Sequence, residues 1–217
     1  MNIRMSDREG LAALVLRLRA DGIADRNLIT ALEKTPRGFF VPPAHVDAAY
    51  SSRSIPIDCG EVMEGVDLSL QMLYLLDLKP GQRVLEVGTG SGFTAAIMAH
   101  LVDRVLTVDR YKTLATLANQ RLAHLGLSNV VVANGDGRDW SEQQGAFDRI
   151  LVTAAFEEMP RSFAERLVSG GRMITAIGEA GRAQTLVRLT KIGSRFERED
   201  LFAVRFQPLH RGVAAIL

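Results

Sequence analysis

The sequence contains little of several features on which particular structures depend. Its one cysteine, Cys59, excludes an internal disulfide and a cysteine-based zinc site. No apolar run approaches the roughly 18 residues of a membrane-spanning helix, and the polar first residues lack the apolar core of a secretory signal. The 26 basic and 25 acidic residues leave a net charge of +1, which argues against nucleic acid as a partner. These absences predict a cytoplasmic protein with no membrane partner.

The length of 217 residues, 47% of them hydrophobic, suits one ordinary domain with a sizeable core. Apolar spacing predicts amphipathic helices over 7–20 and after Asp25, and four of the 7 prolines fall in the irregular stretch 36–65. We expect residues 1–80 to form a helical and irregular extension that packs on a core formed by 81–217, the two together making one structural domain. A monomer and a homodimer both remain open.

After residue 80, short β-rich runs alternate with helical ones, which predicts βαβ units on a parallel sheet. Strands are expected over 83–87, 104–108, 129–133, 148–152 and 171–177, and helices over 68–78, 93–101, 111–125 and 160–167. The last two runs, 185–190 and 201–206, leave no room for a helix between them and so predict an antiparallel hairpin. The expected fold class is therefore α/β, with a mostly parallel sheet and a C-terminal antiparallel hairpin.

Glycines and acids follow three successive predicted strands. The segment 86–92 (Glu-Val-Gly-Thr-Gly-Ser-Gly) joins a strand to a helix, where glycines allow a tight turn and close approach to a ligand. Asp109 ends the next strand, where an acid commonly accepts a hydrogen bond from a ribose, and Gly135-Asp136-Gly137 follows the third. Each feature alone is also consistent with a turn or a helix cap. Together they predict a ligand site at the carboxyl edge of the sheet.

The residues of this edge favour S-adenosylmethionine over a dinucleotide. The dinucleotide fingerprint requires a third glycine one place after Gly92, where this chain has Phe93. Glu86 would repel a diphosphate and attract an ammonium group, and S-adenosylmethionine has an ammonium group, a sulfonium and no phosphate. The expected cofactor-binding residues are Glu86, Gly88, Thr89, Gly90, Ser91, Gly92, Asp109, Arg110, Asp136 and Gly137. The scattered histidines have no metal-ligand spacing, so no metal site is predicted.

Further segments occur in an order typical of one enzyme family. They are Pro36-Arg37-Gly38-Phe39-Phe40-Val41-Pro42, Ala49-Tyr50, Ile55-Pro56-Ile57, the glycine-rich loop with Phe93, Gly135-Asp136-Gly137, the stretch 147–155, Pro160, and Val204-Arg205-Phe206-Gln207-Pro208-Leu209. From about Leu28 to Leu209, the chain resembles the protein-L-isoaspartate (D-aspartate) O-methyltransferases. The glycine-rich loop is shared by many methyltransferases, whereas its combination with the first and last of these segments is far more specific.

The resemblance implies a Rossmann-like class I S-adenosylmethionine-dependent methyltransferase fold. It also implies methyl transfer to the side-chain carboxylate of isoaspartyl residues in damaged proteins, so that an isoaspartyl-containing peptide or protein is the expected partner. Such a carboxylate is already ionised at neutral pH and requires no strong general base. Holding it in line with the sulfonium methyl and removing its water would supply most of the rate.

The sequence departs from the family in the loop before helix 68–78. Members normally carry Gly-Gln-Thr-Ile-Ser there, and this chain has Gly60-Glu61-Val62-Met63-Glu64. The family's hydroxyls at this site help to place the acceptor carboxylate. The resemblance therefore makes Glu64, which stands for the serine, the candidate catalytic residue. If ionised, Glu61 and Glu64 would each repel an acceptor carboxylate by about 1–4 kcal/mol at about 4 Å.

The altered loop leaves several functions open. The family's acceptor is tolerated if Glu64 points away from it or is protonated. Alternatively, Glu64 acts as a general base toward an amine or hydroxyl of a small molecule or tRNA. A third alternative is a non-catalytic cofactor-binding protein that has lost its acceptor site. Glu61 and Glu64 are also consistent with an ordinary solvated loop.

Overall fold

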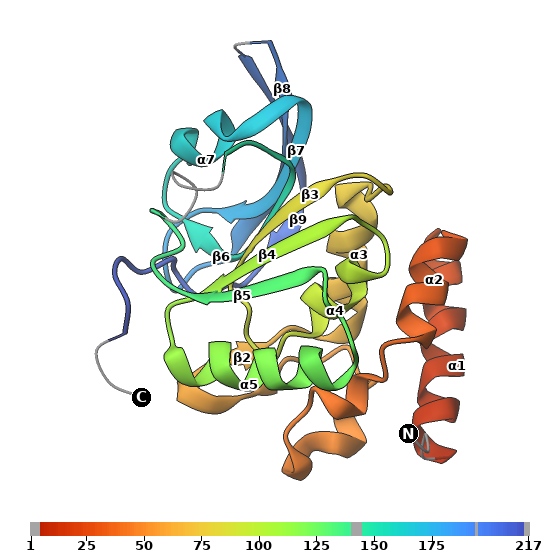
Figure 1. Ribbon diagram of the computed structural model, residues 1–217. Coiled ribbons are helices and arrows are strands. Elements are labelled where there is room, and N and C mark those ends of the chain that lie inside the picture. The colour runs from red at the N-terminus through yellow and green to blue at the C-terminus, as the bar shows by residue number, and fades with distance from the viewer. Residues whose placement is uncertain (1–4, 140–144, 194, 215–217) are drawn as a thin grey trace.

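The computed structural model describes residues 5–139, 145–193 and 195–214. Its central feature is a seven-stranded sheet with the strand order β5-β4-β3-β6-β7-β8-β9 (Figure 1). The strands are β3 (Arg83–Val87), β4 (Arg104–Asp109), β5 (Val130–Asn134), β6 (Phe147–Phe156), β7 (Leu167–Ile177), β8 (Gln184–Ile192) and β9 (Arg195–Val204). The pairs from β5 to β7 are parallel, and β8 pairs antiparallel with both β7 and β9. The predicted fold class is confirmed.

Helices and short irregular elements precede and cover this sheet. The helices are α1 (Met5–Ala20), α2 (Arg26–Glu33), α3 (Val66–Leu76), α4 (Phe93–Ala99), α5 (Lys112–His124) and α7 (Arg161–Glu165). The irregular stretch contains the 3-10 helices η1 (Arg37–Phe39), η2 (Pro43–Ala48) and η3 (Asp58–Gly60), and a small hairpin of β1 (Ile55–Pro56) and β2 (Val62–Met63). As predicted, α2 begins after Asp25, whose side chain accepts a hydrogen bond from the Leu28 N–H at 2.8 Å.

Two hydrophobic clusters lie on opposite faces of the sheet, because successive side chains of a strand point to opposite sides. Val84 belongs to the cluster on the face covered by α3, α4 and α5, and Leu85 to the cluster on the face of α7. The first cluster continues outward to Leu14 and Leu18 of α1. It therefore contains residues from both sides of position 80. The division into 1–80 and 81–217 stays a prediction.

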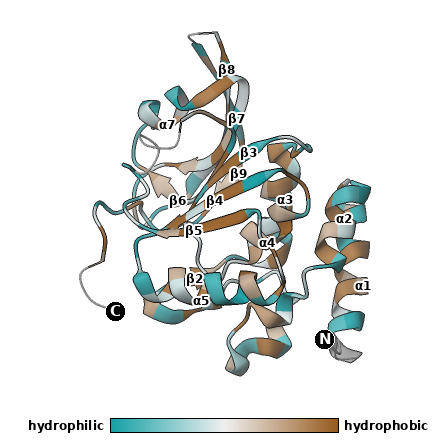
Figure 2. Cartoon of the chain, in the orientation of Figure 1, coloured by the Kyte–Doolittle hydropathy of each residue, from teal (hydrophilic) through white to brown (hydrophobic). Residues whose placement is uncertain are grey.

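The hydropathy of each element follows its burial. In Figure 2 the central strands are mostly hydrophobic, whereas hydrophobic and hydrophilic residues alternate along α1, α2 and α5. β3 is buried at four of its five positions and β4 at five of its six, as expected for strands covered on both faces. The helices have one solvated face and so keep the amphipathic pattern.

The terminal hairpin is longer than predicted. The second strand was expected to begin at Leu201, but β9 begins at Arg195. Most of the first six residues of β9 are exposed, and five of them are charged. Because β9 is an edge strand, charged side chains are tolerated along it, and Glu199 accepts a 2.9 Å hydrogen bond from Arg188 of β8. This part of the strand was not predicted because it lacks the alternation of hydrophobic and polar residues.

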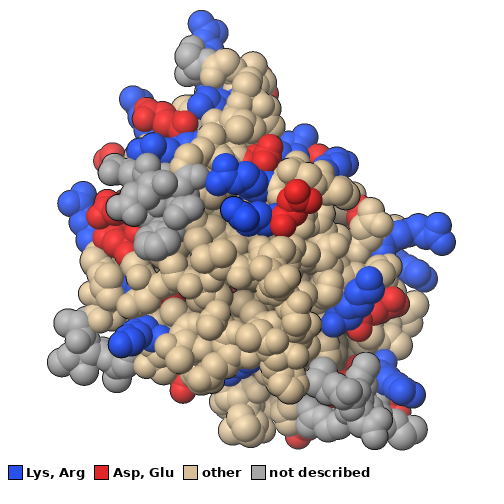
Figure 3. Space-filling model, in the orientation of Figure 1, with Lys and Arg blue, Asp and Glu red and all other residues tan. Residues whose placement is uncertain are grey.

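Charges of both signs are mixed on the surface. On the face shown in Figure 3, Lys and Arg are dispersed, with Asp and Glu among them. Arg172 of β7 and Arg198 of β9 form ion pairs with Asp77 at 2.9 Å and with Asp200 at 2.6 Å, respectively. Within residues 5–139, 145–193 and 195–214, no helix is both long enough and apolar enough to cross a membrane.

Candidate active site

A pocket lies at the carboxyl ends of the parallel strands. It is lined by Val87–Gly88 at the end of β3, Val108–Asp109 at the end of β4, and Thr153–Ala154 of β6. The opposite wall contains Arg37 and the β1–β2 hairpin, and Gln207–His210 closes one side. Its void of about 1030 Å³, part of it open to solvent, is large enough for a small-molecule ligand. Of the predicted residues at the strand ends, Gly88, Asp109 and Gly137 thus converge on one site.

The glycine-rich loop lies against this pocket by its backbone. Gly88, Gly90 and Gly92 all have positive φ, at 96°, 52° and 88°, a region that other residues rarely adopt. A Cβ on Gly88 would also stand 2.3 Å from Thr153 Oγ1. The loop residues Gly88, Thr89, Gly90 and Ser91 line the pocket. Gly92 is not a lining residue; it begins α4 and packs against Ala118 of α5.

Asp109 is held by backbone hydrogen bonds at the end of β4. Its Oδ2 accepts from the Gly90 N–H and its Oδ1 from the Tyr111 N–H, both at 2.9 Å. Burial raises the pKa of Asp109, while these two N–H groups oppose that rise. Each oxygen retains capacity to accept a further hydrogen bond. Arg110 also lines the pocket, with its guanidinium carbon 5.4 Å from the centre of the Tyr111 ring.

Glu86 lies beneath the pocket and is fully buried. Its carboxyl accepts hydrogen bonds from Thr107 Oγ1 at 2.6 Å and from Thr94 Oγ1. Burial raises the pKa of Glu86 to about 7, and the two hydroxyl donors limit the rise. Of these three residues Thr94 lines the pocket, so a ligand would meet Thr94 before Glu86. The direct contact between Glu86 and a ligand ammonium group stays a prediction.

Asp136 and Gly137 differ in their position. Gly137 lines the pocket, and a Cβ there would stand 2.2 Å from Val87 Cγ1. Asp136 is not a lining residue; its carboxylate accepts hydrogen bonds from the N–H groups of Arg138 and Gly212. It therefore fastens the C-terminal segment to the loop after β5. A cofactor contact by Asp136 itself stays a prediction.

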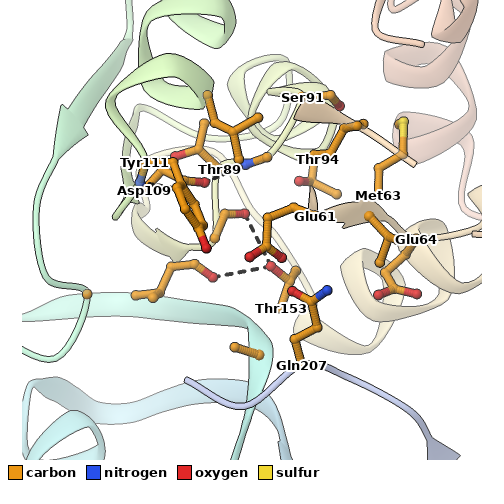
Figure 4. A pocket seen from close by; sticks show the side chains of 18 of the residues that line it. Glu61, Met63, Glu64, Thr89, Ser91, Thr94, Asp109, Tyr111, Thr153 and Gln207 are labelled. Carbon is orange, nitrogen blue, oxygen red and sulfur yellow. Dashed lines mark hydrogen bonds between the residues drawn. The ribbon is translucent and has the colours of Figure 1, made fainter. Parts of the chain in front are cut away.

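The β1–β2 hairpin brings the altered loop to the pocket. In Figure 4, Glu61 points into the space between Tyr111, Thr153 and Gln207, and Glu64 lies to one side of it, near Met63. Burial raises the pKa of Glu61, and a hydrogen bond with the Tyr111 side chain opposes the rise. The loop therefore lines the pocket with two partly buried glutamates, and their role in function stays a prediction.

Glu64 has an environment that favours its neutral form. Burial raises its pKa to about 7, while Ser54, whose hydroxyl lies 3.5 Å from Glu64 Oε2, and the positive charge of Arg37 oppose the rise. Arg37 Nη2 donates a hydrogen bond to the backbone carbonyl of Glu64. The candidate catalytic residue therefore lies in the pocket wall, where burial raises its pKa toward neutral pH.

Several lining residues were not predicted as site residues. They are Arg37, Tyr111, Thr153 and the segment Gln207–His210. Arg37 and Gln207–Leu209 belong to the segments that carried the family resemblance, which is the signal that could have located them. Their distance along the chain from the glycine-rich loop concealed their part in the pocket. In the part of the chain that the structure describes, no group of three or more His, Cys, Asp or Glu side chains is placed to hold a metal ion.

Comparison with known proteins identifies the family. A sequence model of the protein-L-isoaspartate(D-aspartate) O-methyltransferase (PCMT) family matches residues 9–214. The protein-L-isoaspartate O-methyltransferase of Rhizobium meliloti (strain 1021) is 50% identical over 204 residues, which cover 94% of this chain and 100% of that protein. The enzyme of the same name from Azorhizobium caulinodans is 42% identical over 212 residues, 98% of both chains.

Solved structures agree in fold. The crystal structure of a Plasmodium falciparum protein, described as a protein-L-isoaspartate O-methyltransferase in complex with S-adenosyl-L-homocysteine, superposes with a TM-score of 0.80. It is 24% identical, over 91% of this chain and 97% of that one, and shows the shared fold. Because the family model spans nearly the whole sequence and two relatives match over almost their full length, this chain belongs to the protein-L-isoaspartate(D-aspartate) O-methyltransferase family.

Proposed function

We propose that this protein is an S-adenosylmethionine-dependent O-methyltransferase that methylates the side-chain carboxylate of isoaspartyl residues in peptides or proteins. The observation that carries the proposal is membership of the family over nearly the whole chain, including the segments on both walls of the pocket. A cytoplasmic location, a monomeric or homodimeric state and the absence of a nucleic-acid partner stay predictions.

The residues of the pocket fit this cofactor. Asp109 offers carboxylate oxygens with spare acceptor capacity, which suit the two hydroxyls of a ribose. The glycines at 88 and 137 let the backbone beside the pocket pack closely, since a Cβ would stand 2.3 Å from Thr153 Oγ1 at position 88 and 2.2 Å from Val87 Cγ1 at position 137. When bound, S-adenosylmethionine supplies a methyl group made electrophilic by its sulfonium. Asp109, Gly88–Ser91 and Gly137 would hold it.

The chain itself would contribute position and exclusion of water. An isoaspartyl carboxylate is ionised at neutral pH, so it can attack without giving up a proton. Met63, Met72 and Phe93 line the pocket with apolar surface that displaces water from a bound acceptor. Glu64 loses much of its negative charge near neutral pH, which reduces its repulsion of the acceptor. The expected rate therefore comes mainly from orientation within a partly apolar site.

A second candidate function rests on Glu64. A carboxylate with a pKa of about 7 is well matched to act as a general base near neutral pH. In that case the acceptor would be a hydroxyl or amine of a small molecule or of tRNA, and Glu64 would receive its proton. This alternative requires Glu64 to be ionised in the active enzyme, whereas an isoaspartyl acceptor favours its neutral form.

Transfer of a labelled methyl group distinguishes these functions. The purified protein is incubated with labelled S-adenosylmethionine and an isoaspartyl peptide, its normal aspartyl isomer, or tRNA. We expect base-labile methyl ester on the isoaspartyl peptide only. Label on tRNA, or equal label on both peptides, would refute the proposal. Cofactor binding with no transfer to any of these acceptors would favour a binding protein instead.

A further inference from the structure

Arg37 has an unusual position for a charged residue. Its exposed fraction is 0%, and it lines the pocket next to the acceptor loop. Nη2 donates to the backbone carbonyl of Glu64, and the guanidinium carbon lies 4.3 Å from the centre of the Phe93 ring. Nε and Nη1 are buried and have no hydrogen-bond partner among the described residues. A guanidinium has five N–H donors, so much of its capacity is unused.

Buried polar groups almost always have a hydrogen-bond partner, so unpaired donors at a pocket require an explanation. Burial lowers the pKa of Arg37 to about 9, which still leaves the guanidinium charged at neutral pH. Besides the Tyr50 phenol, its charge interacts with two carboxyl groups, and both of these are engaged elsewhere. Asp67 binds Arg17 through hydrogen bonds of 2.9 and 3.0 Å, and the Glu64 carboxyl faces the Ser54 hydroxyl.

We propose that Arg37 is the carboxylate-binding residue of this pocket, where Nε or Nη1 donates to a carboxylate of the bound ligand. The inference rests on the proposed function, because that reaction uses two ligands and each of them carries a carboxylate. One is at the amino-acid end of the cofactor, and the other is the isoaspartyl side chain of the acceptor. Binding would satisfy an unpaired donor and neutralise a buried charge in one step.

Among the charged residues that line the pocket, Arg37 is the one placed to attract a carboxylate at the end near Glu64. Glu61, Glu64 and Asp109 are all lining residues, and an anionic ligand would be repelled by them. Arg110, the other lining arginine, also has a buried Nε without a hydrogen-bond partner in the described part of the chain. Its guanidinium, however, lies over Tyr111 beside Asp109, whereas Arg37 has two such nitrogens next to Glu64. Arg37 therefore supplies the positive charge at the end of the pocket that Glu64 and Met63 form.

Arg37→Met, Arg37→Lys and the exposed control Arg104→Met test the proposal. Calorimetry measures the Kd of S-adenosylhomocysteine and of 5′-methylthioadenosine, which lacks the amino-acid end. If Arg37 binds the cofactor carboxylate, Arg37→Met raises the Kd of S-adenosylhomocysteine by about ten- to a hundredfold and leaves the Kd of 5′-methylthioadenosine unchanged. If it binds the acceptor, both Kd values stay unchanged and KM for an isoaspartyl peptide rises by that factor. In either case Arg37→Lys recovers part of the loss, and Arg104→Met matches the wild type.

A measurement on the wild-type protein avoids dependence on the folding of the variants. The 15N–1H resonance of Arg37 Nε is followed while S-adenosylhomocysteine, and then an isoaspartyl peptide, is added. A shift with one ligand identifies the source of the carboxylate, and neither reading requires turnover, so a failure of the proposed methyl transfer is seen separately. The proposal would be overturned if the Arg37 Nε resonance shifted with neither ligand. It would also be overturned if Arg37→Met raised the Kd of S-adenosylhomocysteine and of 5′-methylthioadenosine by the same factor.

Discussion

The resemblance places Glu64 at the position of a serine, so its charge would govern whether an anionic acceptor can approach. Its carboxyl is half-buried, and the guanidinium of Arg37 reaches its backbone carbonyl and not its side chain. Burial therefore acts on Glu64 more strongly than its neighbours do, and its pKa rises to about 7. The same residue would obstruct a carboxylate acceptor when ionised and accommodate it when protonated.

This environment predicts a pH dependence. Because Glu64 loses its proton as the pH rises through about 7, we expect kcat/KM for an isoaspartyl peptide to be several-fold higher at pH 6 than at pH 8. The acceptor carboxylate stays ionised throughout this range and does not contribute. In Glu64→Ser, most of this decrease in kcat/KM between pH 6 and pH 8 should disappear, so that its kcat/KM at pH 8 exceeds that of the wild type. Steady-state rates across pH 5.5–8.5 check both expectations.

Glu64→Gln is the matched control, since it keeps the size of the side chain and removes its titration. Glu86, whose pKa is also raised to about 7, is present in all three proteins, so the ratio of two profiles isolates Glu64. A wild-type rate that rises with pH, together with an inactive Glu64→Gln, would instead identify Glu64 as a general base.

For single residues, the sequence predicted which ones lie at the same edge of the sheet better than it predicted which side chains touch one another. The ends of parallel strands share one edge, so Gly88, Asp109 and Gly137 could be placed together from the order of the strands alone. The side chain of Glu86 could not, because its two hydroxyl partners, Thr94 and Thr107, come from α4 and β4. Arg37 was missed for a similar reason: its burial depends on packing against Phe93, which is distant in sequence.

The β1–β2 hairpin is the element that positions Glu61 and Glu64. It consists of two residue pairs, Ile55 with Met63 and Pro56 with Val62, so its own hydrogen bonds cannot fix its place. Close packing at Gly65, just before α3, holds it against the preceding turn. A Cβ on Gly65 would stand 2.1 Å from the Ser52 carbonyl oxygen.

We therefore expect Gly65→Ala to displace the hairpin. The clash is with backbone, so we expect a loss of about 1–3 kcal/mol in the free energy of unfolding. We also expect a several-fold rise in KM for the isoaspartyl peptide, because Glu61 and Glu64 move with the hairpin. Urea unfolding and steady-state kinetics measure the two effects.

Gly22→Ala is the control that distinguishes displacement of the β1–β2 hairpin from a general loss of stability. Gly22 has a φ of 81° and nothing within 4 Å of an added Cβ, so alanine there should cost about 1–2 kcal/mol through backbone strain alone. It lies in the turn after α1 and should leave KM unchanged. An equal rise of KM in both variants would show that the hairpin is not specifically held by Gly65.

Among the elements, those with a clear local period were predictable and irregular ones were not, while β7 begins at Leu167, inside the expected helix 160–167. Helix α2 begins directly after its predicted cap Asp25, and the observed bounds of strands β3 and β4 lie within one residue of those expected. The stretch 36–65 forms 3-10 helices and two-residue strands, whose conformation is fixed by contacts with other elements. No local pattern encodes such contacts.

Helix α1 is connected to the rest of the molecule through the hydrophobic cluster on the face of the sheet that α3, α4 and α5 cover. Leu14 and Leu18 of α1 belong to the same hydrophobic cluster as Leu70 of α3 and Ile97 of α4. Arg17 adds hydrogen bonds to Asp67 and to the carbonyl of Tyr50. These contacts favour the proposal that residues 1–80 and 81–217 form one structural domain.

A single cooperative unit predicts that damage to α1 lowers the stability of the entire chain. Leu18 has an exposed fraction of 1%, so Leu18→Ala should remove about 2–5 kcal/mol from the free energy of unfolding. In a domain of this size that corresponds to a fall in Tm of at least several degrees. Leu16, which is 67% exposed on the same helix, provides the control, and Leu16→Ala should change stability by less than about 0.5 kcal/mol. Calorimetry and far-ultraviolet circular dichroism should give one coincident transition for all three proteins, because the cluster that α1 shares with the sheet cannot be opened without exposing the core beneath the pocket. An early separate transition in Leu18→Ala, with the main transition unmoved, would show instead that α1 is an independent extension.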